Sequence, residues 1–213
     1  MTIPHHRSLL PVVLALLANG CAPGQDDQTK AGAEQERAGL DPAPVVVLET
    51  NHGRIVMQLD REKAPLSVAN FLRYVGAGFY DGLTFHRVRP NFMIQGGRMT
   101  PDRQRRTTSV PSVQSESENG LKNLRGTVAM ARTRDRHSAT SEFFINHVDN
   151  ADLDFPGRSV EGWGYAVFGK VIEGLDVVDS IAAVPTERWG QHEAIPLDPV
   201  VIERAYLRES TGN

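Results

Sequence analysis

Arg87 stands among apolar and aromatic residues in the segment Phe85–Gly97. Arg87 follows a Phe-His pair, Pro90 separates it from Phe92-Met93, and Gln95 precedes two glycines. The guanidinium is permanently charged and donates through several N–H groups, so it could stabilise a lone pair or negative charge that develops during a reaction. A strand pair with a surface arginine would have the same composition. The segment alone leaves both interpretations open.

Patterns for other chemistries are missing from the sequence. The chain has seven histidines, and none of them forms the His-x-x-x-His spacing that holds a metal on a helix. It also has no Gly-x-Ser-x-Gly of a serine hydrolase and no phosphate-binding loop. We therefore expect a site that uses no metal and no cofactor.

The charge of the chain argues against a nucleic-acid partner. Lys and Arg number 23 against 26 Asp and Glu, a formal net charge of −3, which gives no general attraction to phosphate backbones. Basic runs at Arg103–Arg106 and Arg132–Arg136 are short, and such runs usually mark solvated loops. Because no heptad pattern is present, we also expect a monomer.

The first residues predict an export signal. Residues 1–20 combine a short basic start with an apolar stretch from Leu9 to Ala18, which is too short to span a bilayer. Cys21, the only cysteine, follows at a position that resembles the lipobox of bacterial lipoproteins, although Ala18 occupies the place where those proteins prefer leucine. A structural cysteine in an uncleaved helix is the alternative interpretation.

Residues 21–44 predict a flexible acidic tether, because almost no large apolar residue there could repay the entropy of ordering. Acyl chains on Cys21 would hold the chain on a lipid bilayer. Ala22 follows Cys21 in place of the Asp that resembles an inner-membrane retention signal in some Gram-negative bacteria, which slightly favours the outer membrane. The expected location is the bacterial cell envelope, with the domain of residues 45–213 facing the periplasm.

Residues 45–213 show the patterns of a mainly β domain. Val45–Thr50 and Arg54–Asp60 predict two strands around a glycine-containing turn. Apolar residues at helical spacing after Pro65 predict a helix that ends near Gly76, and Leu175–Ala183 predict a second one. Short strands with Gly-rich connections indicate an antiparallel barrel. These runs are Leu83–Val88, Phe92–Gln95, Gly126–Ala131, Glu142–Asn146, Tyr165–Val171 and Val200–Leu207, and a long polar loop lies between Met99 and Lys122.

Four blocks resemble, in the same order, blocks of the cyclophilin family of peptidyl-prolyl cis-trans isomerases. The resemblance covers roughly residues 45–207, and the short periplasmic bacterial members look most similar. It implies a closed antiparallel eight-stranded barrel capped by two helices, and an enzyme that accelerates X-Pro bond rotation while exported proteins fold. The blocks are Phe85-His86-Arg87 with Phe92–Gly97, Gly126–Arg132, Thr140–Asn146 and Tyr165–Val171.

The resemblance also implies a mechanism. Rotation about an X-Pro bond has a barrier of about 18 to 20 kcal/mol, because the C–N bond has partial double-bond character. The twisted prolyl nitrogen gains a lone pair, and a hydrogen bond from Arg87 would stabilise only that state. Gln95 and His86 belong to the same catalytic group. The implied substrate-binding residues are Phe92, Met93, Ala131, Arg132, Glu142, Phe144, Leu153 and Tyr165, and the partners are proline-containing unfolded or exported polypeptides.

The sequence departs from the family at several of these positions. Glu142 stands where the family commonly has Gln, and it could pair with Arg87 and tune it, or hold it away from the substrate. Asp152 stands where many members have Trp, which predicts weak binding of cyclosporin-like ligands. Tyr165 and Arg132 replace a common His and Asn on the substrate groove, so the peptide preference stays open.

Two other function classes are also compatible with parts of the sequence. Glu142 and Asp152 favour a catalytically weak module or chaperone that holds proline-containing segments in the envelope, whereas Arg87 and its apolar neighbours favour catalysis. A lipocalin-like barrel for a small apolar ligand would have no use for the Phe-His-Arg block.

Overall fold

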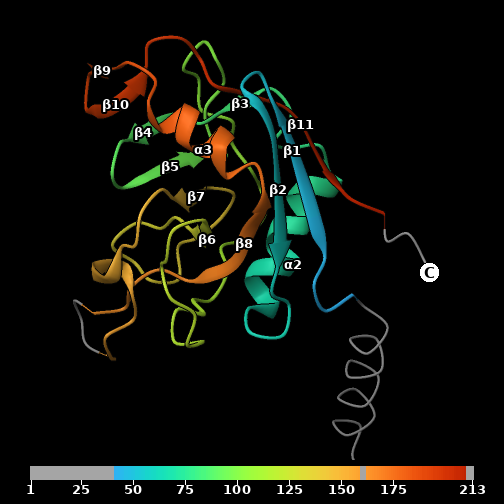
Figure 1. Cartoon of the computed structure of the whole chain (residues 1–213). Helices are drawn as coiled ribbons and strands as arrows, with labels where there is room; N and C mark the ends of the chain where they lie inside the picture. Colours follow the sequence, from blue (N-terminus) through green and yellow to red (C-terminus); the bar gives the residue numbers. More distant parts are fainter. Residues whose placement is uncertain (1–40, 159–161, 210–213) are drawn as a thin grey trace, which may run out of the picture. The chain divides into compact units, whose positions relative to one another are not determined.

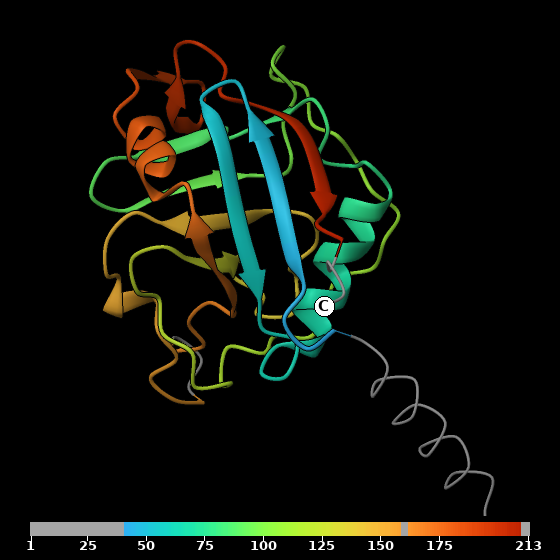
Figure 2. The ribbon, with the colours of Figure 1, turned by 45° about the vertical axis from the view of Figure 1, so that its right-hand side comes forward.

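The computed structural model describes residues 41–158 and 162–209 of the chain. A curled antiparallel sheet forms most of this part, with one helix at each end of the sheet (Figure 1, Figure 2). The strands are β1 (Val45–Thr50), β2 (Gly53–Leu59), β3 (Leu83–Thr84), β4 (Arg87–Arg89), β5 (Met93–Gly96), β6 (Thr127–Met130), β7 (Phe143–Asn146), β8 (Val167–Glu173), β9 (Thr186–Trp189), β10 (His192–Pro196) and β11 (Val201–Leu207), and the helices are α2 (Pro65–Gly76), the short 3-10 helix η1 (Ala151–Leu153) and α3 (Leu175–Ala182).

The main sheet has nine strands in the order β3-β11-β1-β2-β8-β6-β7-β5-β4. This open sheet corrects the closed eight-stranded barrel that the resemblance implies. The run Leu83–Val88, predicted as one strand, divides at Phe85 and His86, where the Phe85 N–H donates to the Val200 carbonyl at 2.9 Å. Its first half pairs with β11 and its second half with β5. The chain itself therefore connects the two edges, and in the described residues no ladder joins β3 to β4.

A separate two-stranded sheet, β9 with β10, was not predicted. Trp189 pairs with His192 across a turn in which Gly190 has a φ of 58°, as tight hairpin turns require. All four residues of β9 are exposed, so no alternation of apolar residues marked this segment. The predicted helices, by contrast, are confirmed within one residue at their ends.

Alternation along β5 and β7 separates the main core from a second apolar cluster. Successive side chains of a strand point to opposite faces. Ile94, Phe143 and Ile145 belong to the main core and are fully buried, whereas Met93 and Phe144 belong to a smaller cluster on the opposite face. The candidate site is built on this second cluster.

The long polar loop between Met99 and Lys122 is fixed at α2. Glu116 accepts hydrogen bonds from the backbone N–H groups of Leu66 at 2.9 Å and Ser67 at 2.8 Å, and from the Ser67 hydroxyl at 2.7 Å. The first N–H groups of a helix lack partners within the helix, and its dipole favours a negative charge there. Glu116 therefore caps α2 and holds the loop against the domain.

The end of the expected tether contacts the domain. The backbone N–H groups of Leu59 and Arg61 donate to the carbonyls of Pro44 at 2.9 Å and Pro42 at 3.0 Å. The expected signal peptide, Cys21 and the rest of the tether lie outside the described residues. Within residues 41–158 and 162–209, no helix has the length and apolar content needed to cross a membrane.

Candidate active site

A row of residues that face one another crosses four neighbouring strands. Arg87 on β4 lies opposite Gln95 on β5, Gln95 lies opposite Phe144 on β7, and Phe144 lies opposite Ala129 on β6. Directly opposed residues on adjacent strands bring their side chains close together on the same face. The register of the sheet thus places a cation, an amide and an aromatic ring side by side.

A pocket of about 260 Å³ opens over this row. Its floor is apolar, because Met93 and Phe144 are almost fully buried. Its rim carries the guanidinium of Arg87 and the amide of Gln95. The residues that line it are Arg87, Phe92, Met93, Gln95, Ala131, Arg132, Phe144, Leu153 and Tyr165.

The far wall of the pocket is fixed by backbone contacts. The Tyr165 N–H donates to the Leu153 carbonyl at 2.9 Å, and the side chain of Asn123 donates to the same carbonyl at 3.0 Å. The Tyr165 ring meets Phe144 edge to face at 5.5 Å between centroids. Arg132 lies over the Tyr165 ring at 4.6 Å and donates to the Gly164 carbonyl at 2.8 Å, so it forms part of the wall rather than a loose surface charge.

Arg87 is half-buried and only partly used by the protein. Its Nη1 donates to Gln95 Oε1 at 3.2 Å, and its Cζ lies 5.9 Å from the centroid of the Phe92 ring. Burial, followed by the charge of Arg89, lowers the pKa of Arg87, and Tyr165 and Glu193 partly offset this. An arginine stays protonated at neutral pH despite such a shift. No other hydrogen bond from its side chain is found in the described part of the chain, which leaves donors for a ligand.

Glu142 does not contact Arg87, which neither of the two expected roles anticipated. It accepts from Arg98 at 2.6 Å and from the Gln95 amide at 2.9 Å, and it lies 3.4 Å from His86 Nε2. Burial raises the pKa of Glu142, but hydrogen bonds and charges from His86 and Arg98 outweigh it and lower the pKa to about 2. Glu142 is thus an anion that acts on Arg87 through Gln95.

The two glycines after Gln95 allow the strands to approach closely. Gly97 has a φ of +92°, and a Cβ there would lie 2.6 Å from the Ser141 carbonyl oxygen. Any other residue would move the start of β7 and with it Glu142. The second glycine of the sequence block therefore has a steric cause.

His86 and Glu142, both expected at the site, do not line the apolar pocket. They line a neighbouring pocket of about 500 Å³ that shares Arg87 and Gln95 with the first. This pocket also contains residues that sequence reasoning missed or assigned to solvated loops. Those residues are Arg98, Arg103, Arg105, Trp189, Gln191, His192 and Glu193. The sequence signal that could have indicated this hairpin is the Trp-Gly-Gln-His turn, since a glycine between polar and aromatic residues is typical of a hairpin.

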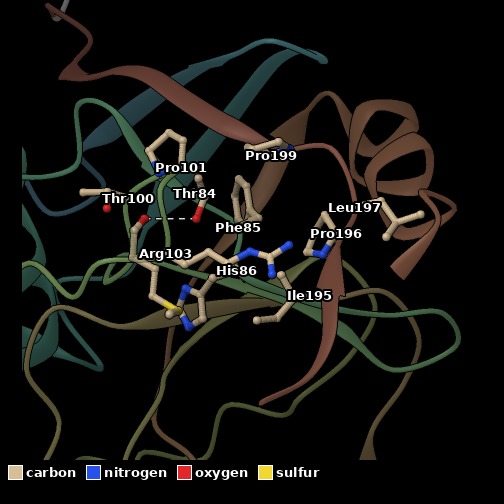
Figure 3. Close-up of a pocket in the computed structure, with 11 residues that line it drawn as sticks. Thr84, Phe85, His86, Thr100, Pro101, Arg103, Ile195, Pro196, Leu197 and Pro199 are labelled. Atoms are coloured by element: carbon tan, nitrogen blue, oxygen red, sulfur yellow. Dashed lines mark hydrogen bonds between the residues drawn. The ribbon is translucent and has the colours of Figure 1, made fainter. Parts of the chain in front are cut away.

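A third cavity, of about 120 Å³, lies between Thr84–His86 and the end of β10 (Figure 3). In Figure 3 the Arg103 side chain crosses it toward Ile195 and Pro196. His86 Nδ1 is buried and has no hydrogen-bond partner among the described residues. In the same part of the chain, no group of three His, Cys, Asp or Glu side chains could hold a metal ion.

Comparison with known proteins agrees with this geometry. Residues 45–207 match the family described as cyclophilin type peptidyl-prolyl cis-trans isomerase/CLD. The chain is 55% identical over 162 residues to the peptidyl-prolyl cis-trans isomerase cyp18 of Streptomyces antibioticus, covering 76% of this chain and 97% of that protein. It is 50% identical over 165 residues to peptidyl-prolyl cis-trans isomerase B of Escherichia coli K12, covering 78% of this chain and all of that protein.

Solved structures give the same fold. A crystal structure of a cyclophilin type peptidyl-prolyl cis-trans isomerase from Cryptosporidium parvum matches with a TM-score of 0.64 at 23% identity, over 79% of this chain and 99% of that one. A second structure of that protein, in the presence of the dipeptide Ala-Pro, matches with the same score and identity. The family match and the two bacterial relatives show that the chain belongs to the cyclophilin-type peptidyl-prolyl cis-trans isomerases.

Proposed function

We propose that the chain accelerates X-Pro rotation by a hydrogen bond from Arg87 to the twisted prolyl nitrogen. The observation that carries this proposal is that Arg87, with N–H groups left over, borders an apolar pocket of about 260 Å³. A proline ring seated on Met93 and Phe144 would bring its nitrogen toward the rim. The Ala-Pro dipeptide in the Cryptosporidium parvum structure supports a proline-containing ligand for this family.

Gln95 supports the proposed role by orienting the guanidinium. A carboxylate accepts hydrogen bonds but cannot donate them, so Glu142 requires the NH₂ of Gln95 on its side. The carbonyl oxygen of Gln95 then faces Arg87, in agreement with the hydrogen bond of 3.2 Å from Arg87 Nη1 to Gln95 Oε1. One donor of Arg87 is held by this contact, and the others have no partner within residues 41–158 and 162–209, so the guanidinium is ordered without being neutralised.

The proposed reaction needs no proton transfer. The lone pair on the prolyl nitrogen exists only when C–N conjugation is lost. A donor placed there therefore stabilises the twisted state more than the ground state, which lowers the barrier. Removing one well-placed donor of this kind costs about 100- to 1000-fold in rate. The role of His86 in this proposal is indirect, through its contact with Glu142.

The test compares three variants of the exported chain in a protease-coupled proline isomerisation assay. Arg87→Ala should lower kcat/KM about 100-fold or more, and Arg87→Lys should recover little, because a lysine lacks the forked donors. Arg89→Ala is the matched control, since Arg89 lies on the same strand, is exposed and does not line the pocket. If the wild-type chain shows no catalysis, or if Arg87→Ala leaves the catalysed rate unchanged, the result would favour a module that binds proline segments without fast turnover.

We further propose that the substrates are exported polypeptides and that the chain works as a monomer, anchored to the cell envelope through acylated Cys21. The support is the apolar stretch Leu9 to Ala18 followed by the only cysteine. Mass spectrometry of the mature N-terminus tests the anchor, and membrane fractionation tests the slight preference for the outer membrane. A mature chain that begins elsewhere than Cys21, or that carries no acyl mass, would refute the anchor.

A further inference from the structure

We propose that the larger pocket beside Arg87 is a second subsite, which binds an acidic side chain of the polypeptide substrate. This inference rests on the proposed function, because it assumes that a polypeptide lies across Arg87. It adds a substrate class, namely segments that carry Asp or Glu near the proline. We call this pocket, lined by Arg103, Arg105 and Trp189 among others, the hairpin subsite.

The hairpin subsite is continuous with the apolar pocket. Both pockets are lined by Arg87 and Gln95, so a chain leaving the proline can pass over these two residues into it. The far wall is the β9–β10 hairpin, and β10 lies against β4, the strand that carries Arg87. Its volume of about 500 Å³ is roughly twice that of the apolar pocket, enough for a long side chain.

The lining of the hairpin subsite presents two donors without acceptors in the described part of the chain, one on the polar loop and one on β9. Neither the Arg105 guanidinium nor the Trp189 indole N–H makes a hydrogen bond or ion pair within residues 41–158 and 162–209, and Trp189 is 42% exposed. Arg98 and Arg103, by contrast, are paired with Glu142 and Glu187, each at 2.6 Å. Unused donors in the lining favour a ligand that accepts hydrogen bonds and carries negative charge.

Trp189 is held in place by its neighbours. The Arg103 guanidinium lies 5.4 Å from the centroid of its ring, and His192 stacks on the ring at 5.8 Å and 13°. The Arg103 side chain reaches β10 from the polar loop, as Figure 3 shows. These two contacts restrict the orientation of the indole ring, so that its N–H needs little ordering to meet an acceptor.

Glu193 makes the part of the hairpin subsite next to Arg87 less favourable for a carboxylate than the rest. It lines the same pocket, and its charge acts on Arg87, so a carboxylate directly beside Arg87 would be repelled. The unused donors belong to other residues of the lining. Since an extended chain advances about 3.3 Å per residue, we expect the favoured acidic side chain within about three residues of the proline rather than next to it.

The experiment uses uncharged reference peptides with one X-Pro bond and places Glu, or isosteric Gln, at each of the three positions on either side. Catalysed exchange is measured by NMR at low ionic strength. One or two Glu positions should raise kcat/KM about two- to fivefold over Gln, the size of an exposed ion pair, and salt should reduce the gain. Arg105→Ala should abolish the gain, and Arg105→Glu should transfer the preference to Lys.

Arg188→Ala is the matched control, because Arg188 precedes Trp189 on β9 but does not line the pocket. It should keep the gain. Equal rates for Glu and Gln peptides at every position, or a gain that persists in Arg105→Ala, would overturn the subsite.

A binding measurement separates this outcome from failure of the proposed function. The chain has two tryptophans, so the indole N–H signal of Trp189 can be assigned by Trp163→Phe. It should shift with the favoured Glu peptide and not with the Gln peptide, even if no peptide is isomerised. Absence of catalysis on the reference peptide refutes the proposed function, whereas an unmoved Trp189 signal refutes the subsite.

Discussion

Gln95 donates through Nε2 to Oε2 of Glu142 at 2.9 Å, and this contact decides which end of the Gln95 amide faces Arg87. An isolated glutamine can turn its amide by half a rotation at little cost. The carboxylate removes that freedom, since the reversed amide would place two acceptors against each other. The order of groups across the sheet is therefore Arg98, Glu142, Gln95 and Arg87, with alternating roles of donor and acceptor.

Glu142→Ala should lower kcat by roughly five- to tenfold, the value of about one hydrogen bond, because Gln95 loses the partner that orients it. Glu142→Gln should restore most of the activity, since its amide oxygen can still accept from Gln95. The measurement is kcat and KM on one peptide. If Glu142 acts by positioning Gln95, its removal should lower kcat rather than raise KM. A Glu142→Ala enzyme with wild-type kcat would contradict this role.

Glu142 should also make stability depend on pH in acid. Its pKa in the folded chain is about 2, below the ordinary value of 4.5. A depressed carboxyl pKa contributes stability that is present above the unfolded pKa and lost as the pH falls through the folded pKa. Between pH 5 and 2, the free energy of unfolding should therefore fall by about 3 kcal/mol more in the wild type than in Glu142→Gln.

Urea denaturation at a series of pH values measures this difference. Asp154 and Asp179 also have lowered pKa values, but they are present in both proteins and cancel in the comparison. Parallel pH profiles for the two proteins would show that the charge of Glu142 is not stabilised in the folded state.

The apolar pocket was accessible to sequence reasoning because most of its residues lie in short contiguous runs. Arg87, Phe92, Met93 and Gln95 fall within nine positions, and the alternation of β5 puts Met93 and Gln95 on one face. The assignment of Phe92 and Met93 to a pocket, like that of Phe144, Leu153 and Tyr165, came from the family resemblance rather than from periodicity. The structure lines one pocket with all of them.

The parts that sequence reasoning missed depend on contacts between distant residues. Leu83, Phe85 and Val88 make this run look like one short strand, and its division into two edge strands depends on pairing with distant residues, including the hydrogen bond from Phe85 to Val200. Glu142 had several arginines available, and the choice of Arg98 rather than Arg87 follows from the register of β5 against β7. Local patterns carry no information about either choice.

Glu116→Ala should lower the free energy of unfolding by about 1 to 2 kcal/mol, because it removes the cap of α2 and one negative charge at the helix N-terminus. Glu118→Ala is the matched control, since Glu118 lies two residues further along the same loop and makes an exposed ion pair with Arg158. That change should have a clearly smaller effect, because exposed ion pairs contribute little to stability. Urea denaturation with both variants tests this, and equal effects would show that the contacts of Glu116 do not stabilise α2.

Asp152 should make cyclosporin-like ligands bind weakly. It is exposed on η1 beside Leu153, which lines the apolar pocket, and it offers no apolar wall where the family resemblance leads us to expect an aromatic residue. Asp152→Trp should strengthen binding at least about tenfold, as buried aromatic anchors do at interfaces. Ala151→Trp, on the same turn, is the matched control, because Ala151 is also exposed and does not line the pocket. Calorimetric titration measures both, and nanomolar affinity of the unchanged chain would show that the apolar pocket alone is sufficient.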